Sequence, residues 1–87
     1  MQQKKVIKIK KILHKNRLLI LQELLKGESC VCELKKTLNM PHNLLSHHLK
    51  VLKEQGILID HKNGLHIKYK ILKKEKPLLV KLFKCLA

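Results

Sequence analysis

The sequence predicts a mainly α-helical domain that contains one small β-hairpin. Apolar residues recur at helical spacing over most of the chain, and the pattern changes to alternation between Leu65 and Ile71. Immediately before that segment stands Asn63-Gly64, a strong short signal for a hairpin turn. The expected order is helix-helix-helix-helix-strand-strand-helix, in a single domain that covers residues 1–87.

The first two helices are expected at residues 4–13 and 17–26. In the first, three apolar residues stand at helical spacing between lysines, namely Val6, Ile9 and Leu13. The second is preceded by Asn16, which can cap its start, and followed by Gly27, which favours helix termination. The second helix is apolar on most of its faces, so we expect it to lie at the centre of the domain.

The next two helices are predicted to form a helix-turn-helix at about residues 30–55. Ser29 can cap the first of them, which covers about residues 30–38. Asn39 stands where the chain must turn, and asparagine tolerates the left-handed conformation that such a turn needs. Pro41 suits the start of the following helix.

A hairpin that follows a helix-turn-helix directly is a wing, here at about residues 57–71. Its strands are expected at 57–61 and 65–71, joined by a type I′ turn at Asn63-Gly64. Together these elements predict a winged helix-turn-helix.

The last helix, residues 77–86, opens at Pro77 and carries an apolar stripe formed by Leu78, Leu79, Leu82, Phe83 and Leu86. A domain of this size buries only about 60% of its unfolded surface, so additional burial would stabilise it. Nothing local covers the stripes of this helix and of residues 4–13. We therefore expect both helices to form a two-fold homodimer.

The charge balance indicates a partner that is a polyanion. Twenty Lys and Arg stand against six Asp and Glu, a formal net charge of +14. Nucleic acid and an anionic membrane both fit, and a solubilising lysine coat is the plainer alternative. No apolar run approaches the roughly 18 residues of a spanning helix, and no signal-peptide pattern opens the chain. With three cysteines, an odd number, the sequence favours a reducing cytoplasm.

The predicted recognition helix has one polar and one apolar face. The apolar face, which must meet the core, holds Leu45, Leu49 and Leu52. The polar face, with the residue that opens the helix, has side chains suited to base edges and phosphates: His42, Asn43, Ser46, His47 and Lys50. On the wing, further phosphate or minor-groove contacts are expected from His61, Lys62 and Lys68. The predicted partner is double-stranded DNA, read as an inverted-repeat operator by the two helices of a dimer.

Two wing histidines form a further candidate pair. A two-residue turn at Asn63-Gly64 places His61 directly opposite His66. Paired histidines can hold a metal ion, but no third ligand is evident in the sequence. We therefore expect two stacked, exposed imidazoles.

The segment between Arg17 and Ile71 carries a family likeness. Its matching pieces are Arg17-Leu18-Leu19-Ile20-Leu21 with Leu24 and Gly27, then Glu28–Leu34, Ser46–Leu58, Asp60–Gly64 and Tyr69. In order and without gaps, they resemble the ArsR/SmtB family of metal-sensing repressors. The Ser-x-His-Leu pattern is common to many winged-helix proteins, whereas Cys-Val-Cys-Glu-Leu at residues 30–34 is far more specific to the metal-sensing branch.

The resemblance implies a homodimeric repressor whose operator affinity falls when a metal or metalloid binds. Two departures from the family pattern matter. Arsenite sensors of the family often carry a third cysteine three residues after the second, where this chain has Lys35. The final helix also lacks the paired histidine and acidic ligands of the family's zinc sensors.

Cys30 and Cys32 are the candidate metal ligands. Arsenite, antimonite, cadmium, lead and zinc are chemically suitable regulatory ions, and no obligatory cofactor is expected. Residues two apart in a helix point about 200° away from each other, so both sulfurs reach one ion only if the helix start is unwound. The helix N-terminus and nearby lysines should favour the thiolate. Cys85 is expected to pack against apolar neighbours, or to be a third ligand if folding or dimerisation brings it near Cys30.

Three alternatives remain open. The cysteines can be inert, so that the protein is a constitutive winged-helix regulator, or they can form a thiol-redox switch. A basic membrane-surface or RNA-surface binder is the third alternative, although neither purpose needs a wing. An enzyme is not expected, because there is no Gly-rich phosphate loop and the six acidic residues are scattered.

Overall fold

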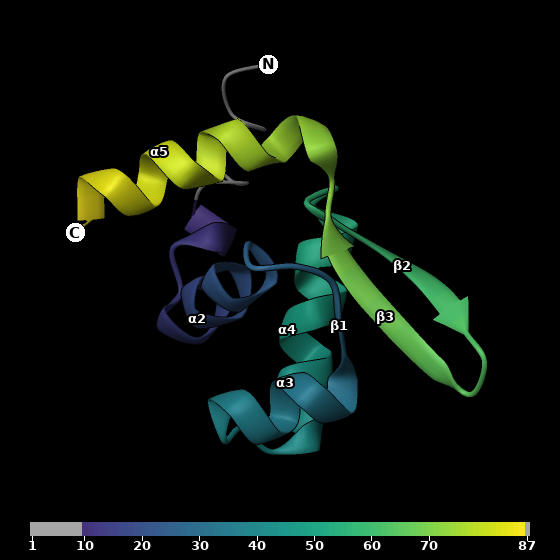
Figure 1. Ribbon diagram of the computed structural model, residues 1–87. Coiled ribbons are helices and arrows are strands. Elements are labelled where there is room, and N and C mark those ends of the chain that lie inside the picture. The colour runs from purple at the N-terminus through teal and green to yellow at the C-terminus, as the bar shows by residue number, and fades with distance from the viewer. Residues whose placement is uncertain (1–9, 87) are drawn as a thin grey trace.

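The computed structural model of the protein describes residues 10–86 (Figure 1). Residues 10–12 are helical, and the elements that follow are α2 (Lys15–Leu24), β1 (Ser29–Cys30), α3 (Val31–Leu38), α4 (His42–Glu54), β2 (Leu58–Asn63), β3 (His66–Ile71), the 3-10 helix η1 (Lys73–Glu75) and α5 (Lys76–Leu86). The predicted fold class, a mainly helical winged helix-turn-helix, is confirmed. None of the helices within these residues is long and apolar enough to cross a membrane.

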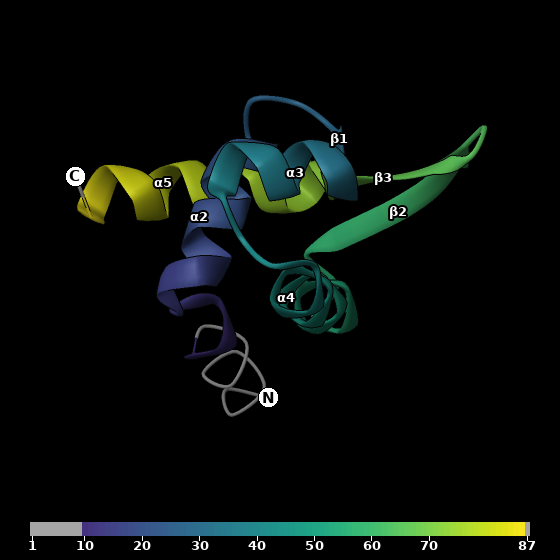
Figure 2. The same cartoon turned by 90° about the horizontal axis from the view of Figure 1, so that it is seen from below.

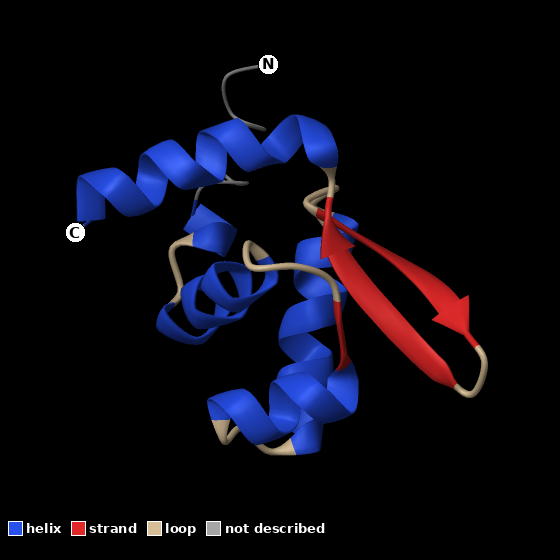
Figure 3. Cartoon of the chain, viewed as in Figure 1, coloured by secondary structure: helices blue, strands red, loops and turns tan. Residues whose placement is uncertain are grey.

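The β-structure is a three-stranded antiparallel sheet with the order β1-β3-β2, so the prediction of a hairpin alone was incomplete (Figure 3). Ser29 lies opposite Tyr69 and Cys30 opposite Lys68. The prediction that Ser29 caps a helix was therefore wrong: this residue belongs to a strand, and α3 begins only at Val31. The distal part of the β2–β3 hairpin extends away from the helical body (Figure 2).

The core lies between the helices and the base of the sheet. Its buried apolar residues are Ile12, Ile20, Leu21, Leu24, Leu34, Met40, Leu45, Leu49, Leu52, Ile57, Leu58, Ile71 and Leu79. The three leucines predicted for the inner face of α4 are fully buried, which confirms that expectation. The helix α2 contributes Ile20, Leu21 and Leu24 to the core, as its predicted central position requires. α5 crosses one end of the bundle and adds Leu79 to the core (Figure 1).

The ends of α2 differ from the prediction. The helix begins at Lys15, because the Nδ1 atom of His14 accepts a hydrogen bond from the backbone N–H of Asn16 at 3.2 Å. His14 therefore holds the capping position that was predicted for Asn16. The helix ends at Leu24, two residues earlier than predicted.

The turn of the helix-turn-helix follows the prediction. Asn39 adopts the left-handed conformation with φ 51° and ψ 49°, and Pro41 directly precedes α4. Between them Met40 is buried, so the turn itself contributes to the core.

The hairpin turn lies one residue later than predicted. Asn63 ends β2 opposite His66, and Gly64 and Leu65 form the two-residue turn. Gly64 has φ +66° whereas Asn63 does not have a positive φ, which is typical of a type II′ turn with glycine first. The predicted pairing of His61 with His66 was consequently wrong, and His61 lies opposite Lys68.

The predicted N-terminal dimerisation helix at 4–13 falls mostly outside the described residues. Within them, Ile12 is buried and Leu13 is half-exposed.

A buried histidine connects three parts of the helical body. His48 on α4 is 2% exposed, and its Nδ1 atom accepts a hydrogen bond from Arg17 Nε at 3.0 Å. Arg17 also donates to the backbone oxygen of Lys11 at 2.9 Å. The Nε2 atom of His48 has no partner among the described residues. Burial lowers the pKa of His48, and the charges of Arg17, His14 and His47 lower it further.

This arrangement predicts that acid destabilises the fold through His48. The folded-state pKa lies below the ordinary value of about 6.5, so the unfolded chain binds the extra proton first as the pH falls. The free energy of unfolding should therefore decrease as the pH falls below about 6.5. In urea titrations from about pH 7.5 to about pH 5, His48→Gln should lose less stability than the wild type.

His42→Gln is the matched control, since His42 is an exposed histidine of the same helix and is not among the groups that lower the pKa of His48. It should keep the wild-type pH dependence. Identical slopes for His48→Gln and the wild type would contradict the assignment.

Candidate functional site

The predicted recognition surface lies on α4. His42, Asn43, His47 and Lys50 are exposed and Ser46 is half-buried, while the leucine face is turned inward. The Ser46 hydroxyl lies 3.4 Å from His42 Nε2, so these two side chains form one polar unit at the start of the helix. The polar face that the periodicity predicted is therefore present and accessible.

The base of the wing is held beside this helix by an ion pair. Lys53 at the end of α4 donates to the Asp60 carboxylate of β2 at 2.9 Å. This hydrogen bond, and then the charge of Asp60, raise the pKa of Lys53. Of the predicted contact residues, His61 and Lys62 are exposed and Lys68 is half-buried. His61 Nε2 also lies 3.6 Å from a carboxylate oxygen of Glu28.

The two cysteines of the Cys-Val-Cys motif meet without any unwinding of a helix. Cys30 is extended, with φ −87° and ψ 164°, and Cys32 lies in the first turn of α3. Their Sγ atoms are 3.3 Å apart. The expectation that both sulfurs reach one ion only from a distorted helix was wrong, because Cys30 lies before the helix and not in it.

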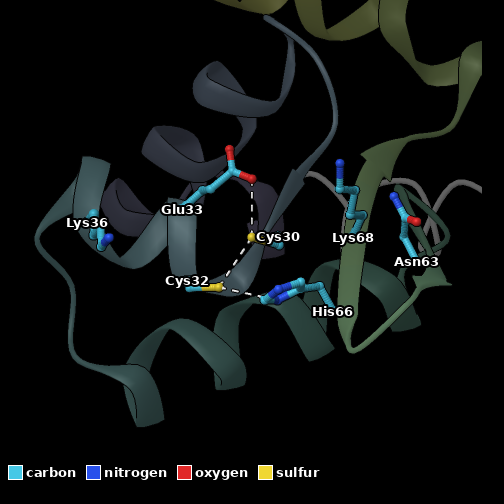
Figure 4. Close-up of a pocket in the computed structure, with 7 residues that line it drawn as sticks. All are labelled: Cys30, Cys32, Glu33, Lys36, Asn63, His66 and Lys68. Atoms are coloured by element: carbon cyan, nitrogen blue, oxygen red, sulfur yellow. Dashed lines mark hydrogen bonds between the residues drawn. The ribbon is translucent and has the colours of Figure 1, made fainter.

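The structure brings a third donor to this pair (Figure 4). His66 Nδ1 lies 3.8 Å from Cys32 Sγ, and the donor atoms of Cys30, Cys32 and His66 are all within 4.8 Å of one another. The strand register explains the approach. Cys30 pairs with Lys68, so it shares a sheet face with Lys68 and with His66, which lies two residues before Lys68 in β3. Two sulfurs and one imidazole nitrogen suit soft and borderline metal ions.

Sequence reasoning missed His66 as a partner of the cysteines. Cys30 comes close to His66 because β1 pairs with β3. Since β1 has only two residues, it has no periodicity that the sequence could reveal. Cys85, the other ligand considered, lies on α5, is exposed and is absent from the donor cluster of the described residues. Its expected packing role is wrong within a single chain.

The acidity of Cys30 also differs from expectation. The backbone N–H of Glu33 lowers its pKa, as a helix N-terminus should. The contact with Cys32, burial and the Glu33 carboxylate, whose Oε1 accepts from Cys30 Sγ at 3.2 Å, act in the opposite direction and leave the pKa above its ordinary value. The predicted preference for the thiolate is therefore outweighed at Cys30 in the metal-free site.

The three donors open onto a cleft of about 530 Å³ between α3 and the wing. It is lined by Cys30, Cys32, Glu33, Lys36, Asn63, His66 and Lys68 (Figure 4). A neighbouring hollow of about 340 Å³ shares both cysteines and His66, and reaches His42 of the recognition helix. The candidate metal site thus adjoins both elements that are predicted to face DNA, the wing and α4.

The chain has relatives among known regulators. It is 42% identical over 53 residues to the arsenical resistance operon repressor of Escherichia coli (strain K12), a match that covers 61% of this chain and 44% of that protein. The chain thus spans less than half the length of that relative.

Solved structures share the whole fold. HlyU from Vibrio cholerae N16961 has a TM-score of 0.87 at 28% identity, and the match covers 97% of this chain and 92% of that chain. The transcriptional repressor BigR from Xylella fastidiosa has a TM-score of 0.81 at 30% identity, over 92% of this chain and 83% of that chain. Residues 14–60, more than half of the chain, match the bacterial regulatory proteins of the arsR family, and the chain belongs to that family.

Proposed function

We propose that the protein is a sequence-specific DNA-binding repressor that a thiophilic metal or metalloid releases from its operator. The observation that carries the proposal is the pair of sulfurs 3.3 Å apart at the start of a helix-turn-helix. Thiolates are the ligands that soft ions prefer. The similarity to a repressor named for arsenical resistance supports the same reading.

DNA binding rests on shape and charge together. A major groove admits one α-helix, and α4 offers an exposed polar face of the appropriate length. The wing adds Lys62, and the net charge of +14 favours phosphate contacts. No enzymatic activity and no membrane partner are proposed, and the reduced cysteines suit action in the cytoplasm.

We further propose that the protein acts as a homodimer through α5 and the N-terminal segment. Ile12, Leu78, Leu79 and Leu82 line an apolar hollow of about 110 Å³. Leu78 is 56% exposed and Leu13 is 49% exposed, so a single chain leaves apolar surface uncovered here. A two-fold axis at this surface would present two α4 helices to an inverted repeat.

Release follows from the position of the cysteines. An ion that draws the two sulfurs into its coordination shell acts on β1 and on the first turn of α3, and α3 packs against α4. A small movement of α4 in each subunit is sufficient to weaken DNA binding by about 1–3 kcal/mol, the coupling free energy that is typical of allosteric proteins. By linkage, operator DNA must weaken ion binding by the same factor.

The first prediction of this proposal concerns DNA contacts. Asn43→Ala and His47→Ala should each relax sequence preference, by about 1–3 kcal/mol if the contact is to a base edge. Lys62→Ala should weaken all sequences alike and reduce the salt dependence by about one unit, because it removes one phosphate contact. Fluorescence anisotropy with a panel of operator variants at several salt concentrations measures both effects.

Lys74→Ala is the charge-matched control, since it removes one exposed lysine from η1. The assignment fails if Lys62→Ala changes sequence preference while Asn43→Ala and His47→Ala leave it unchanged.

The second prediction concerns assembly. The wild type should sediment at twice the 10.2 kDa of the chain, and Leu78→Asp should shift it to the monomer and weaken operator binding. The reason is that burial of the new carboxylate at position 78 in the interface is costly unless an opposite charge pairs with it. Leu65→Asp, at the exposed tip of the wing, should leave the dimer intact. A wild-type monomer at micromolar concentration with operator DNA would overturn the dimer.

The third prediction concerns the switch. Replacement of both Cys30 and Cys32 by Ser should preserve operator affinity and abolish release, whereas Cys85→Ser should behave as the wild type. The measurement is a titration of the reduced protein on labelled operator with arsenite, antimonite, cadmium, lead and zinc in turn. If none of them loosens the wild-type complex, the protein is a winged-helix repressor without metal sensing.

A further inference from the structure

His66 is a candidate metal ligand in the cysteine cleft that the proposed function does not use. It is exposed, it lies on β3 near the wing tip, and its Nδ1 atom points at Cys32 Sγ from 3.8 Å (Figure 4). Two of the three contacts within the group already lie close to the spacing that a common metal ion requires. Around a tetrahedral zinc ion two thiolate sulfurs lie about 3.8 Å apart, and a sulfur and an imidazole nitrogen about 3.6 Å apart.

The observed distances need little adjustment. The two sulfurs, 3.3 Å apart, would separate by about 0.5 Å, and the sulfur–nitrogen contact of 3.8 Å would shorten by about 0.2 Å. The remaining spacing, between Cys30 Sγ and His66 Nδ1, is within 4.8 Å, and the exposed imidazole of His66 would move toward Cys30 when an ion binds. The cleft is open, so water can supply a fourth ligand.

We propose that Cys30, Cys32 and His66 form a mixed thiolate–imidazole site for a borderline divalent cation, zinc or cadmium. This inference rests on the proposed function and narrows the regulatory ion from any thiophilic metal or metalloid to a divalent cation. Two thiolates and a neutral imidazole balance the charge of a divalent ion. A trivalent metalloid instead forms bonds to three thiolates, and Lys35 occupies the position where a third cysteine of the same helix would stand.

The nitrogen ligand also defines what the ion connects. The two sulfurs belong to β1 and α3, whereas the imidazole belongs to the wing. An ion held by all three joins the wing to the first helix of the helix-turn-helix. The base of β2 is already joined to the end of α4 by the Lys53–Asp60 ion pair, so the ion would restrain the distal part of the wing, which carries Lys62.

The test is direct ion binding by the reduced full chain. Cobalt serves as the spectroscopic probe, because thiolate coordination gives charge-transfer bands, and zinc affinity follows from competition with a chelator. The wild type should bind one zinc per chain, more tightly than arsenite. Even an outer-shell change typically costs 10–100-fold in metal affinity, so His66→Ala, which removes a direct ligand, should weaken zinc binding by at least about 10-fold.

His61→Ala is the matched control. His61 is an exposed histidine of the same hairpin and lies on the same sheet face, but it is opposite Lys68 and beside Glu28, outside the donor cluster. It should keep wild-type zinc affinity, and neither histidine variant should alter arsenite binding. Circular dichroism and metal-free operator affinity establish that His66→Ala is folded. In the wild type, the NMR signals of the imidazole nitrogens of His66 should shift when zinc is added.

The outcomes separate this inference from the proposed function. Equal zinc affinity of His66→Ala and His61→Ala, or arsenite bound more tightly than zinc, would overturn the mixed site, while release by arsenite would still support a metalloid-responsive repressor. Zinc binding that depends on His66 but leaves the operator complex unchanged would support the site and overturn release by zinc.

Discussion

Ser29 and Cys30 pair with Tyr69 and Lys68 of β3, and the candidate metal site depends on this short ladder. Pairing holds Cys30 in the extended conformation, so α3 begins one residue later and Cys32 turns back toward Cys30. The same pairing aligns Cys30 with the sheet face that carries His66. Backbone hydrogen bonds between strands thus assemble donors from two distant segments of the chain.

The ladder also connects the two cysteines to the recognition helix through the sheet. β3 is the central strand, with β1 and the cysteines on one side and β2 on the other. β2 is joined to the recognition helix through Lys53 and Asp60, and α3 packs directly against that helix. An ion bound as proposed would join α3 to the wing, and would therefore act on the two elements that are predicted to face DNA. Coupling of this kind needs only small displacements, because packed elements move as units.

A second constraint holds the helical body together. Arg17 donates to His48 and to the backbone of Lys11, and thereby connects α2, α4 and the helical residues 10–12. His48 is buried next to this cation, so the neutral imidazole is the form that the fold accommodates. The recognition helix is thus held by a polar contact in addition to its buried leucines. Because this contact needs a neutral His48, the stability of the fold is sensitive to acid.

Periodicity and local chemistry were sufficient for the helices, the left-handed turn at Asn39 and the polar face of α4, because each depends on neighbours within one or two turns. The motif Cys30-Val31-Cys32 likewise indicated a metal site from sequence alone. Pairing between distant segments was not predictable in this way. A two-residue strand has no period, so β1 and the approach of His66 were missed.

The turn shows the same limit at single-residue scale. Asn63-Gly64 correctly located the hairpin, but the turn at Gly64-Leu65 pairs His61 with Lys68 instead of His66. The sequence by itself therefore determined the element order, the exposed polar face of α4 and two of the three clustered donors. Only the tertiary structure decided the strand register and the third donor, because both depend on which backbone groups pair across the sheet.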